Sequence, residues 1–131
     1  MKIQDDLTKY ISSALNNTLP AKTKIKTRFH LLDAIVSILT GRLLPPGQKS
    51  FNFSKNQGGA EEATLLGNNI KVSAINAAFS NGMAAHANET DDSHTKGRFH
   101  PGCAIIPTTL AIAERENLNS EDQCCSVQTR S

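Results

Sequence analysis

The sequence predicts a mainly α-helical protein that contains one small β-hairpin. Over most of the chain, apolar residues recur at intervals of three and four, which places them on one face of a helix. Proline, glycine and asparagine separate these stretches, as they do between helices. One segment, ATLLGNNIKVS, instead has two short apolar runs on either side of Gly67-Asn68-Asn69, a tripeptide that permits a tight turn.

Two helical patterns open the chain. The first ends at Asn16, Asn17 and Pro20, and its apolar residues share one face: Ile3, Leu7, Tyr10, Ile11, Ala14 and Leu15. The second is expected from about Ala21 to Arg42. Its main stripe consists of Ile25, Phe29, Leu32, Val36, Leu39 and Leu43, and it is widened by Leu31, Ile35 and Ile38. So broad an apolar surface predicts burial on more than one side.

A proline-rich segment, LLPPGQ, begins at Leu43 and is expected to break the helical pattern, because two prolines and a glycine do not continue a helix. A short helix or turn should follow it as far as the Gly58-Gly59 pair. The hairpin comes next, with strands expected at Thr64–Leu66 and Ile70–Val72.

Two more helices are predicted after the hairpin. Ser73 can cap the helix SAINAAFSNGMAAHAN, whose small side chains allow neighbouring backbones to approach closely, so we expect this helix to be central. After Pro101, the run CAIIPTTLAIAEREN indicates another helix, which either begins near Pro107 or is kinked there. Cys103 is expected to be a packing residue at the start of this helix, and His30 a packing residue on the second helix.

The end of the sequence has a different character. Asn119–Asp122 has the residue types of a helix start, but the chain continues as QCCSVQTRS, without the amphipathic pattern of a helix. We therefore assign residues 1–122 to a partial helical domain and residues 123–131 to an aberrant or truncated tail, as an interrupted reading frame would leave. Cys124 and Cys125 are adjacent and cannot easily bridge each other, so no disulfide framework is expected.

Length and charge restrict the classes of function. A chain of 131 residues has the length of one domain. Its net charge of +2 is too small for strong electrostatic attraction to nucleic acid. The cations between Lys22 and Arg28 are spaced as on a solvated helix face. No apolar run approaches the roughly twenty residues of a membrane span, and the first ten residues lack the apolar core of a signal peptide. We therefore expect a cytoplasmic protein that binds neither nucleic acid nor membranes.

The segment His86–Gly102, HANETDDSHTKGRFHPG, concentrates titratable side chains. It holds three of the four histidines and three acidic residues. Carboxylates and imidazoles that lie together can divide the roles of acid and base, and the same side chains are ordinary metal ligands. Alternatively, Asp91 or Asp92 caps a helix and His100 hydrogen-bonds a carbonyl group. The composition leaves these three interpretations open.

A longer segment around these residues, NGMAAHANETDDSHTKGRFHPGCAIIPTTLAIAE, resembles the signature region of the MmgE/PrpD family. Upstream, the stretches GGAEEATLLG and LLDAIVSILTGR also resemble segments of that family, so the resemblance covers about residues 1 to 122. The matching positions include Asp33, Gly41, Asn81-Gly82, Ala85-His86, Asp91-Asp92, His100-Pro101, Pro107 and Ala113-Glu114.

The resemblance implies the N-terminal part of an all-helical domain, with the family's smaller α/β lid domain absent from these residues. Family members such as 2-methylcitrate dehydratase, cis-aconitate decarboxylase and iminodisuccinate epimerase are longer and act on small di- and tricarboxylates. They need no metal or organic cofactor, and their chemistry moves a proton at a carbon next to a carboxylate. Their further site residues, a lysine, another histidine and lid residues, come from later segments.

By resemblance, then, we expect this chain to be inactive alone. We also expect the helix from Ala21 to Arg42 and the helix capped by Ser73 to expose apolar faces. Full-length relatives are expected to be homodimers.

The same resemblance assigns roles by position. Asp91 and Asp92 take the place of the family's paired acids and His100 that of its histidine before proline, so these three are the expected catalytic residues. The expected substrate-binding residues are Glu89, which stands where many members have aspartate, with Ser93, His86, Lys96 and Arg98. His86 is equally compatible with helix packing, and exposed loop cations such as Lys96 are often only solvated.

Two other classes of function stay open. A metal-dependent hydrolase would use the ligands His86, Asp91, His94 and His100. A non-catalytic helical binding module would use none of them for chemistry.

Overall fold

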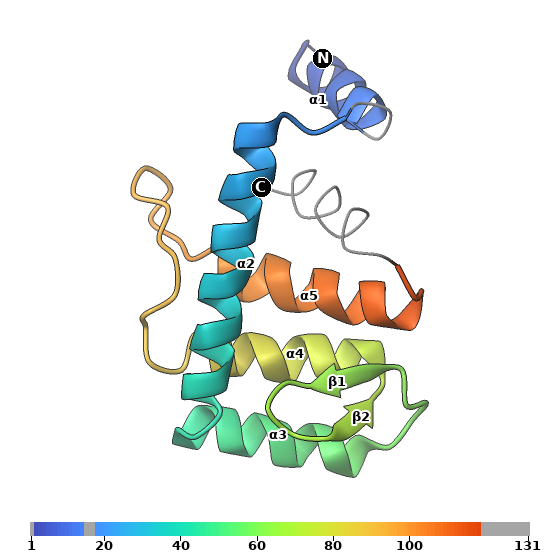
Figure 1. The fold of residues 1–131 in the computed structure, drawn as a ribbon, viewed down its shortest axis with the longest axis vertical. Helices are drawn as coiled ribbons and strands as arrows, with labels where there is room; N and C mark the ends of the chain where they lie inside the picture. Colours follow the sequence, from blue (N-terminus) through green and yellow to red (C-terminus); the bar gives the residue numbers. More distant parts are fainter. Residues whose placement is uncertain (1, 15–17, 119–131) are drawn as a thin grey trace.

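The computed structural model describes residues 2–14 and 18–118, and helices make up most of it (Figure 1). Within these residues lie α1 (Lys2–Ala14), α2 (Ala21–Gly41), α3 (Pro45–Gln57), β1 (Ala63–Leu65), β2 (Ile70–Val72), α4 (Ala74–Ala85) and α5 (Gly102–Arg115). The predicted mainly α-helical fold with a small hairpin is confirmed. The helix start expected at Asn119 and the tail assigned to residues 123–131 lie outside the described residues. None of the described helices combines the length and the apolar character that crossing a bilayer requires.

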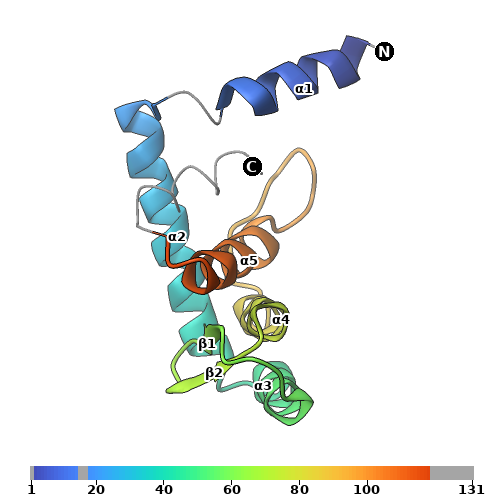
Figure 2. The same ribbon diagram turned by 90° about the vertical axis from the view of Figure 1, so that its right-hand side faces the viewer.

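Helix α4 lies at the centre of the fold. Helices α3, α4 and α5 stack side by side, α2 crosses one end of the stack, and α1 lies beyond the N-terminal end of α2 (Figures 1 and 2). The hairpin lies against the stack, and α4 contacts α2, α3, α5 and both strands. The central position predicted for this alanine-rich helix is confirmed.

Small side chains explain why α4 accepts so many neighbours. Ala77 and Ala84 are fully buried. Where α2 crosses α4, a Cβ atom added to Gly41 would collide with the carbonyl oxygen of Ala84. Where α5 crosses α4, a Cβ atom added to Gly82 would lie 2.8 Å from the carbonyl oxygen of Cys103. Both crossings therefore depend on the absence of a side chain on one helix.

The predicted break is confirmed, since α2 ends at Gly41, and the expected short helix follows as α3. Helix α3 differs from the prediction only in its start, because it begins at Pro45 and includes both prolines in its first turn. The first positions of a helix need no backbone N–H bond, so proline begins a helix well although it cannot continue one. Gly47 lets this turn pass close to the end of α2, since a Cβ atom there would lie 2.7 Å from the Cα atom of Arg42. Further along, the hydroxyl groups of Ser54 and Ser80 are 2.6 Å apart and join α3 to α4.

The hairpin agrees with the prediction except that β1 begins at Ala63 rather than at Thr64. The strands are antiparallel, with Thr64 opposite Lys71. Leu66, predicted to end the first strand, lies in the turn, because its backbone N–H donates to the side chain of Asn81 on α4 (3.0 Å) instead of to β2. The side-chain amide of Asn81 also donates to the carbonyl oxygen of Thr64 (3.0 Å). One buried asparagine thus fastens the hairpin to the central helix.

Helix α5 begins at Gly102 and continues through Pro107, so the alternative in which it begins near Pro107 is wrong. Proline lacks an N–H, and the carbonyl group of Cys103, four residues earlier, therefore has no helical partner. That carbonyl group faces Gly82 on α4. Pro107 and Gly82 thus act at the same crossing, one by freeing a carbonyl group and the other by making room for it.

The burial of α2 differs from the prediction. Its main apolar stripe is exposed, and Phe29 in that stripe keeps 68% of its surface. Helices α4 and α5 meet α2 on the opposite face, where most residues are small: Thr27, Ala34, Ser37, Ile38 and Gly41. The prediction that α2 is buried on more than one side is therefore wrong for the described residues. The apolar face of α1 is exposed as well: Ile3, Leu7, Tyr10 and Ile11.

Candidate functional site

The carboxylate of Asp91 is the centre of a cluster of titratable side chains. Only 2% of the Asp91 side chain is exposed, and its two oxygens lie 3.1 and 3.2 Å from Nδ1 of His86. Nδ1 of His100 lies 3.4 Å from Oδ1 of the same carboxylate. The two imidazole rings contact each other, with their centroids 4.9 Å apart. One buried carboxylate therefore faces two histidines.

The backbone brings these residues together from both ends of the long loop between α4 and α5. His86 caps the C-terminal end of α4, where its N–H donates to the carbonyl oxygen of Gly82 (3.2 Å). The chain then turns at Glu89, whose φ of 54° is in the left-handed region, and Asp91 follows. His100 lies directly before Pro101, the N-cap of α5. Both imidazoles are thus held at helix ends.

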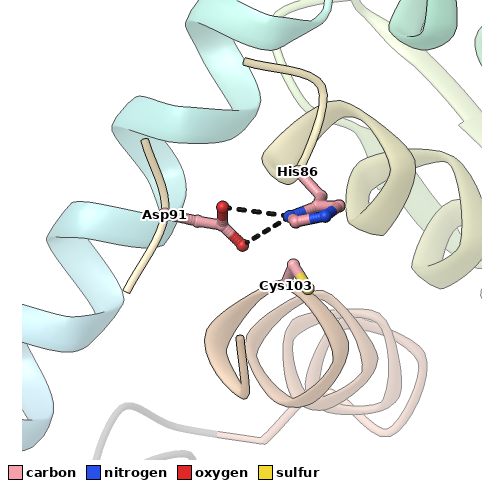
Figure 3. Close-up of side chains that lie close together, drawn as sticks. All are labelled: His86, Asp91 and Cys103. Atoms are coloured by element: carbon pink, nitrogen blue, oxygen red, sulfur yellow. Dashed lines mark hydrogen bonds and ion pairs between the residues drawn. The ribbon is translucent and has the colours of Figure 1, made fainter. Parts of the chain in front are cut away.

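Cys103, in the first turn of α5, is the third side chain that points into the cluster, beside His86 and Asp91 (Figure 3). Its thiol donates to the carbonyl oxygen of His100 (3.1 Å). Burial, together with the negative charge of Asp91, raises the pKa of the Cys103 thiol to about 11. The thiol is therefore protonated at neutral pH in the absence of a bound cation, and Cys103 lacks the activation that a catalytic nucleophile needs.

Asp92 does not join its neighbour in the cluster. Its Oδ1 accepts a hydrogen bond from the backbone N–H of Gly102 (2.7 Å), at the N-terminal end of α5. Its Oδ2 lies 3.7 Å from Nδ1 of His30 on α2. A carboxylate at this end of a helix satisfies a free N–H and interacts favourably with the helix dipole. The predicted pair of acids is therefore divided between two sets of partners.

The predicted substrate-binding residues of the loop face solvent. Glu89, Ser93, Lys96 and Arg98 are exposed, and none of their side chains has a hydrogen bond or ion pair with another described residue. The loop is closed by an isolated antiparallel bridge between residues 94 and 99. The ring of His94 stacks on that of Phe99, with centroids 5.2 Å apart.

His94 also accepts a hydrogen bond at Nδ1 from the backbone N–H of Gly97 (2.9 Å). Its role in the loop is therefore structural, and the metal set predicted with His94 is not brought together. The potential ligand atoms that do converge belong to His86, Asp91 and Cys103 and lie within 4.8 Å of one another.

The sequence predicted that His30 and Cys103 are packing residues, but each lies beside one of the two aspartates. His30 lies three residues after the buried Thr27 and four before the buried Ala34, and this spacing indicates that it points toward the neighbouring helices. Cys103 follows His100 by three residues at a helix start, so it lies close to the end of the loop that carries this histidine. Both signals were present in the sequence, but neither identifies Asp91 or Asp92 as the partner.

A separate hollow of about 450 Å³ lies between the hairpin, α4 and α5, and Glu114 is among its lining residues. The carboxylate of Glu114 accepts hydrogen bonds from the backbone N–H (2.7 Å) and the hydroxyl group (2.6 Å) of Thr64, and Nζ of Lys71 lies 3.0 Å from it. Burial alone would raise the pKa of Glu114, but the hydrogen bonds from Thr64 and Lys71 outweigh it and lower the pKa. These partners satisfy the carboxylate, so the contact is structural.

Comparison with known proteins identifies one family. The sequence profile of the MmgE/PrpD N-terminal domain matches residues 5–124. No curated protein matches the chain.

Proposed function

Because the chain belongs to the MmgE/PrpD family, we propose that its Asp91 cluster is one wall of a site that moves a proton next to a carboxylate group. The substrate is a small di- or tricarboxylate, and the reaction belongs to the lyases or isomerases: dehydration, decarboxylation or epimerisation. This chemistry requires a positioned acid or base and cations that hold the substrate. By family resemblance, it uses no metal or organic cofactor.

The position of Asp91 between two imidazoles supports this proposal most directly. A buried carboxylate is stable only with hydrogen-bonded or charged partners, and the described partners are Nδ1 of His86 and of His100. A carboxylate that faces Nδ1 orients the imidazole and stabilises its protonated form, which leaves the other ring nitrogen for a substrate. About a third of the His100 side chain is exposed although its Nδ1 is buried, so the accessible part of the ring lies elsewhere.

These contacts suggest different roles for the predicted catalytic residues. We assign His100 as the general acid or base, and Asp91 as the positioning residue that orients it. Asp92 acts at a distance, because it holds the first turn of α5, which follows His100, against His30. His86, which is half exposed, is the second imidazole and contacts a substrate carboxylate when protonated.

The exposed side chains of the loop are free to contact a substrate. We propose that Lys96 and Arg98 attract its carboxylates, while Glu89 and Ser93 contribute to its selection. By family resemblance a lysine, a further histidine and a lid form the opposite wall. We therefore expect no turnover of 2-methylcitrate, cis-aconitate or iminodisuccinate by the 131-residue chain alone, and turnover of any of them would contradict this part of the proposal.

Carboxylate binding is tested by NMR, with citrate added to the chain while the imidazole C2–H resonances are followed. We expect citrate to shift the resonances of His86 and His100 in a saturable manner. His94 serves as the comparison, because its ring stacks on Phe99 outside the cluster; since its loop also carries Lys96 and Arg98, we expect a smaller shift there. The His100→Gln variant should lose most of the affinity, whereas His94→Gln should retain it. Equal shifts of all histidines, or affinity unchanged in His100→Gln, would refute the assignment.

A further inference from the structure

The Asp91 cluster contains three donor types that transition metals prefer. An imidazole nitrogen of His86, a carboxylate oxygen of Asp91 and the sulfur of Cys103 lie within 4.8 Å of one another (Figure 3). In tetrahedral zinc sites the ligand distances of about 2.0–2.3 Å place neighbouring ligand atoms roughly 3.3–3.8 Å apart. The nitrogen of His86 already lies 3.1 and 3.2 Å from the Asp91 oxygens. Small side-chain rotations would therefore bring all three atoms into a coordination sphere.

The charges of the cluster suit a divalent cation. A bound Cys103 is a thiolate, and with the buried Asp91 carboxylate it supplies two negative charges, which neutralise the cation in a partly buried site. When the cation binds, the S–H bond breaks, sulfur keeps the electron pair as the new ligand, and the proton passes to solvent. A sulfur and an imidazole ligand favour Zn²⁺ and Co²⁺, whereas Mg²⁺ and Ca²⁺ prefer oxygen.

A cation can reach the cluster from solvent, and a neighbouring histidine supports the Asp91 ligand. The side chain of His86 is 48% exposed and that of Asp91 only 2%, so a cation can enter from the side of His86. Nδ1 of His100 is buried without a hydrogen bond to a described residue, and it lies 3.4 Å from Oδ1 of Asp91. An imidazole N–H in that position can hold the carboxylate from outside, as the groups behind metal ligands do in known sites.

We propose that His86, Asp91 and Cys103 form a binding site for a zinc-class divalent cation, with a fourth position left to water. The ligands come from the C-terminal end of α4, the loop and the first turn of α5, so cation binding ties three segments together. The site does not depend on the proposed proton transfer. Cation binding and proton transfer cannot occur at the same time, because a cation bound to His86 and Asp91 occupies the carboxylate that orients His100.

The test uses Co²⁺ as the probe, because a thiolate ligand produces a charge-transfer band in the near ultraviolet. The full chain carries Cys124→Ser and Cys125→Ser, which leaves Cys103 as its one thiol. We expect one Co²⁺ per chain, the thiolate band, and displacement by Zn²⁺ but not by Mg²⁺. Cys103→Ser should abolish the band, and His86→Gln should weaken Co²⁺ binding by about tenfold or more while the chain stays folded by circular dichroism.

His94→Gln is the matched control, since it removes a loop histidine outside the cluster and should leave the Co²⁺ affinity unchanged. If no thiolate band forms, if the band survives in Cys103→Ser, or if His94→Gln weakens binding as much as His86→Gln does, the proposal is wrong. Because His86 is half exposed, its glutamine variant tests the site even if Cys103→Ser does not fold.

Discussion

At the scale of single residues, several positions that match the family signature have structural partners. Glu114 on α5 binds Thr64 and Lys71 of the hairpin, and Asn81 on α4 binds Thr64 and Leu66. These contacts satisfy backbone groups at the edges of a two-stranded sheet that could not otherwise pair. Two signature residues thus position the hairpin, whereas three others, His86, Asp91 and His100, form the Asp91 cluster.

The Glu114→Gln variant tests this structural role through pH. The folded pKa of Glu114 lies below its ordinary value of 4.5, so its contribution to stability is present above pH 4.5 and is lost as the pH falls through the lower folded pKa. Near pH 7 we expect Glu114→Gln to lower the free energy of unfolding by about 1 kcal/mol, since partial exposure screens these charge-assisted bonds.

Urea unfolding at a series of pH values measures this difference between Glu114→Gln and the parent chain. We expect the difference to narrow as the pH falls below 4.5, because the parent then loses the same interaction. Glu116→Gln is the control, since the Glu116 side chain is exposed and its carboxylate bonds only Arg115 among the described residues. A difference that stays constant across the pH range would contradict the prediction.

At the scale of secondary-structure elements, two close helix crossings hold α4 between α2 and α5. Each crossing places the backbone of one helix against a glycine of another, Gly41 on α2 and Gly82 on α4. Such contacts leave no space for a methyl group, and in a close-packed interior the neighbouring helix must move to accept one. The position of α4 also determines where His86 lies, because His86 caps its C-terminal end.

Alanine substitution at the crossings therefore has two opposing effects. Alanine favours a helix over glycine by about 1 kcal/mol, whereas overpacking a tight contact costs about 1–3 kcal/mol. Because a Cβ atom on Gly41 would collide with a backbone carbonyl group, we expect the second effect to dominate and Gly41→Ala to destabilise the chain.

Gly82→Ala should be destabilising by a smaller amount, since its Cβ atom would lie 2.8 Å from the nearest oxygen. Urea denaturation provides the measurement, with Asn52→Ala on the exposed face of α3 as a control that should change little. An unchanged or increased stability of Gly41→Ala would show that the crossing is looser than described.

At the scale of the whole molecule, the described chain leaves a long apolar stripe on α2 in contact with solvent. Its residues repeat at intervals of four and three along the helix and are all exposed: Ile25, Phe29, Leu32, Val36 and Leu39, followed by Leu43 in the turn after α2. Continuous apolar patches of this kind promote association, because burial of each large side chain is worth about 1.5–3 kcal/mol. A net charge of +2 provides little repulsion against it.

We therefore expect the purified chain to associate as its concentration rises, and the double variant Phe29→Lys with Val36→Lys to remain monomeric. Lysine suits an exposed helix and raises the net charge, so the fold should be retained. The control variant, Asn52→Lys with Gln57→Lys, adds the same charge on α3, away from the stripe.

Light scattering coupled to size-exclusion chromatography compares the three proteins over a range of concentrations. If the α3 control is as monomeric as the Phe29→Lys, Val36→Lys variant, the prediction is wrong, because net charge and not the apolar stripe then controls association.

Much of the fold could be predicted from the sequence, because local rules determine it. Apolar spacing located α2, and the caps and breakers placed α4 and α5 within a few residues. The small side chains of α4 predicted its central position, since only such a helix permits close approach on several sides. The segment from His86 to Gly102 was also identified as the chemically dense part of the chain.

Only the tertiary structure decided which neighbours these local features meet. Periodicity showed that α2 has a broad apolar stripe, but the small residues on its other face allowed α4 and α5 to pack there instead. Asp91 and Asp92 are adjacent in sequence and nearly identical in local pattern, yet one faces two imidazoles and the other caps α5. The reason is physical: the sequence pattern specifies what a side chain prefers to contact, whereas the crossing of helices distant in sequence decides which group is within reach.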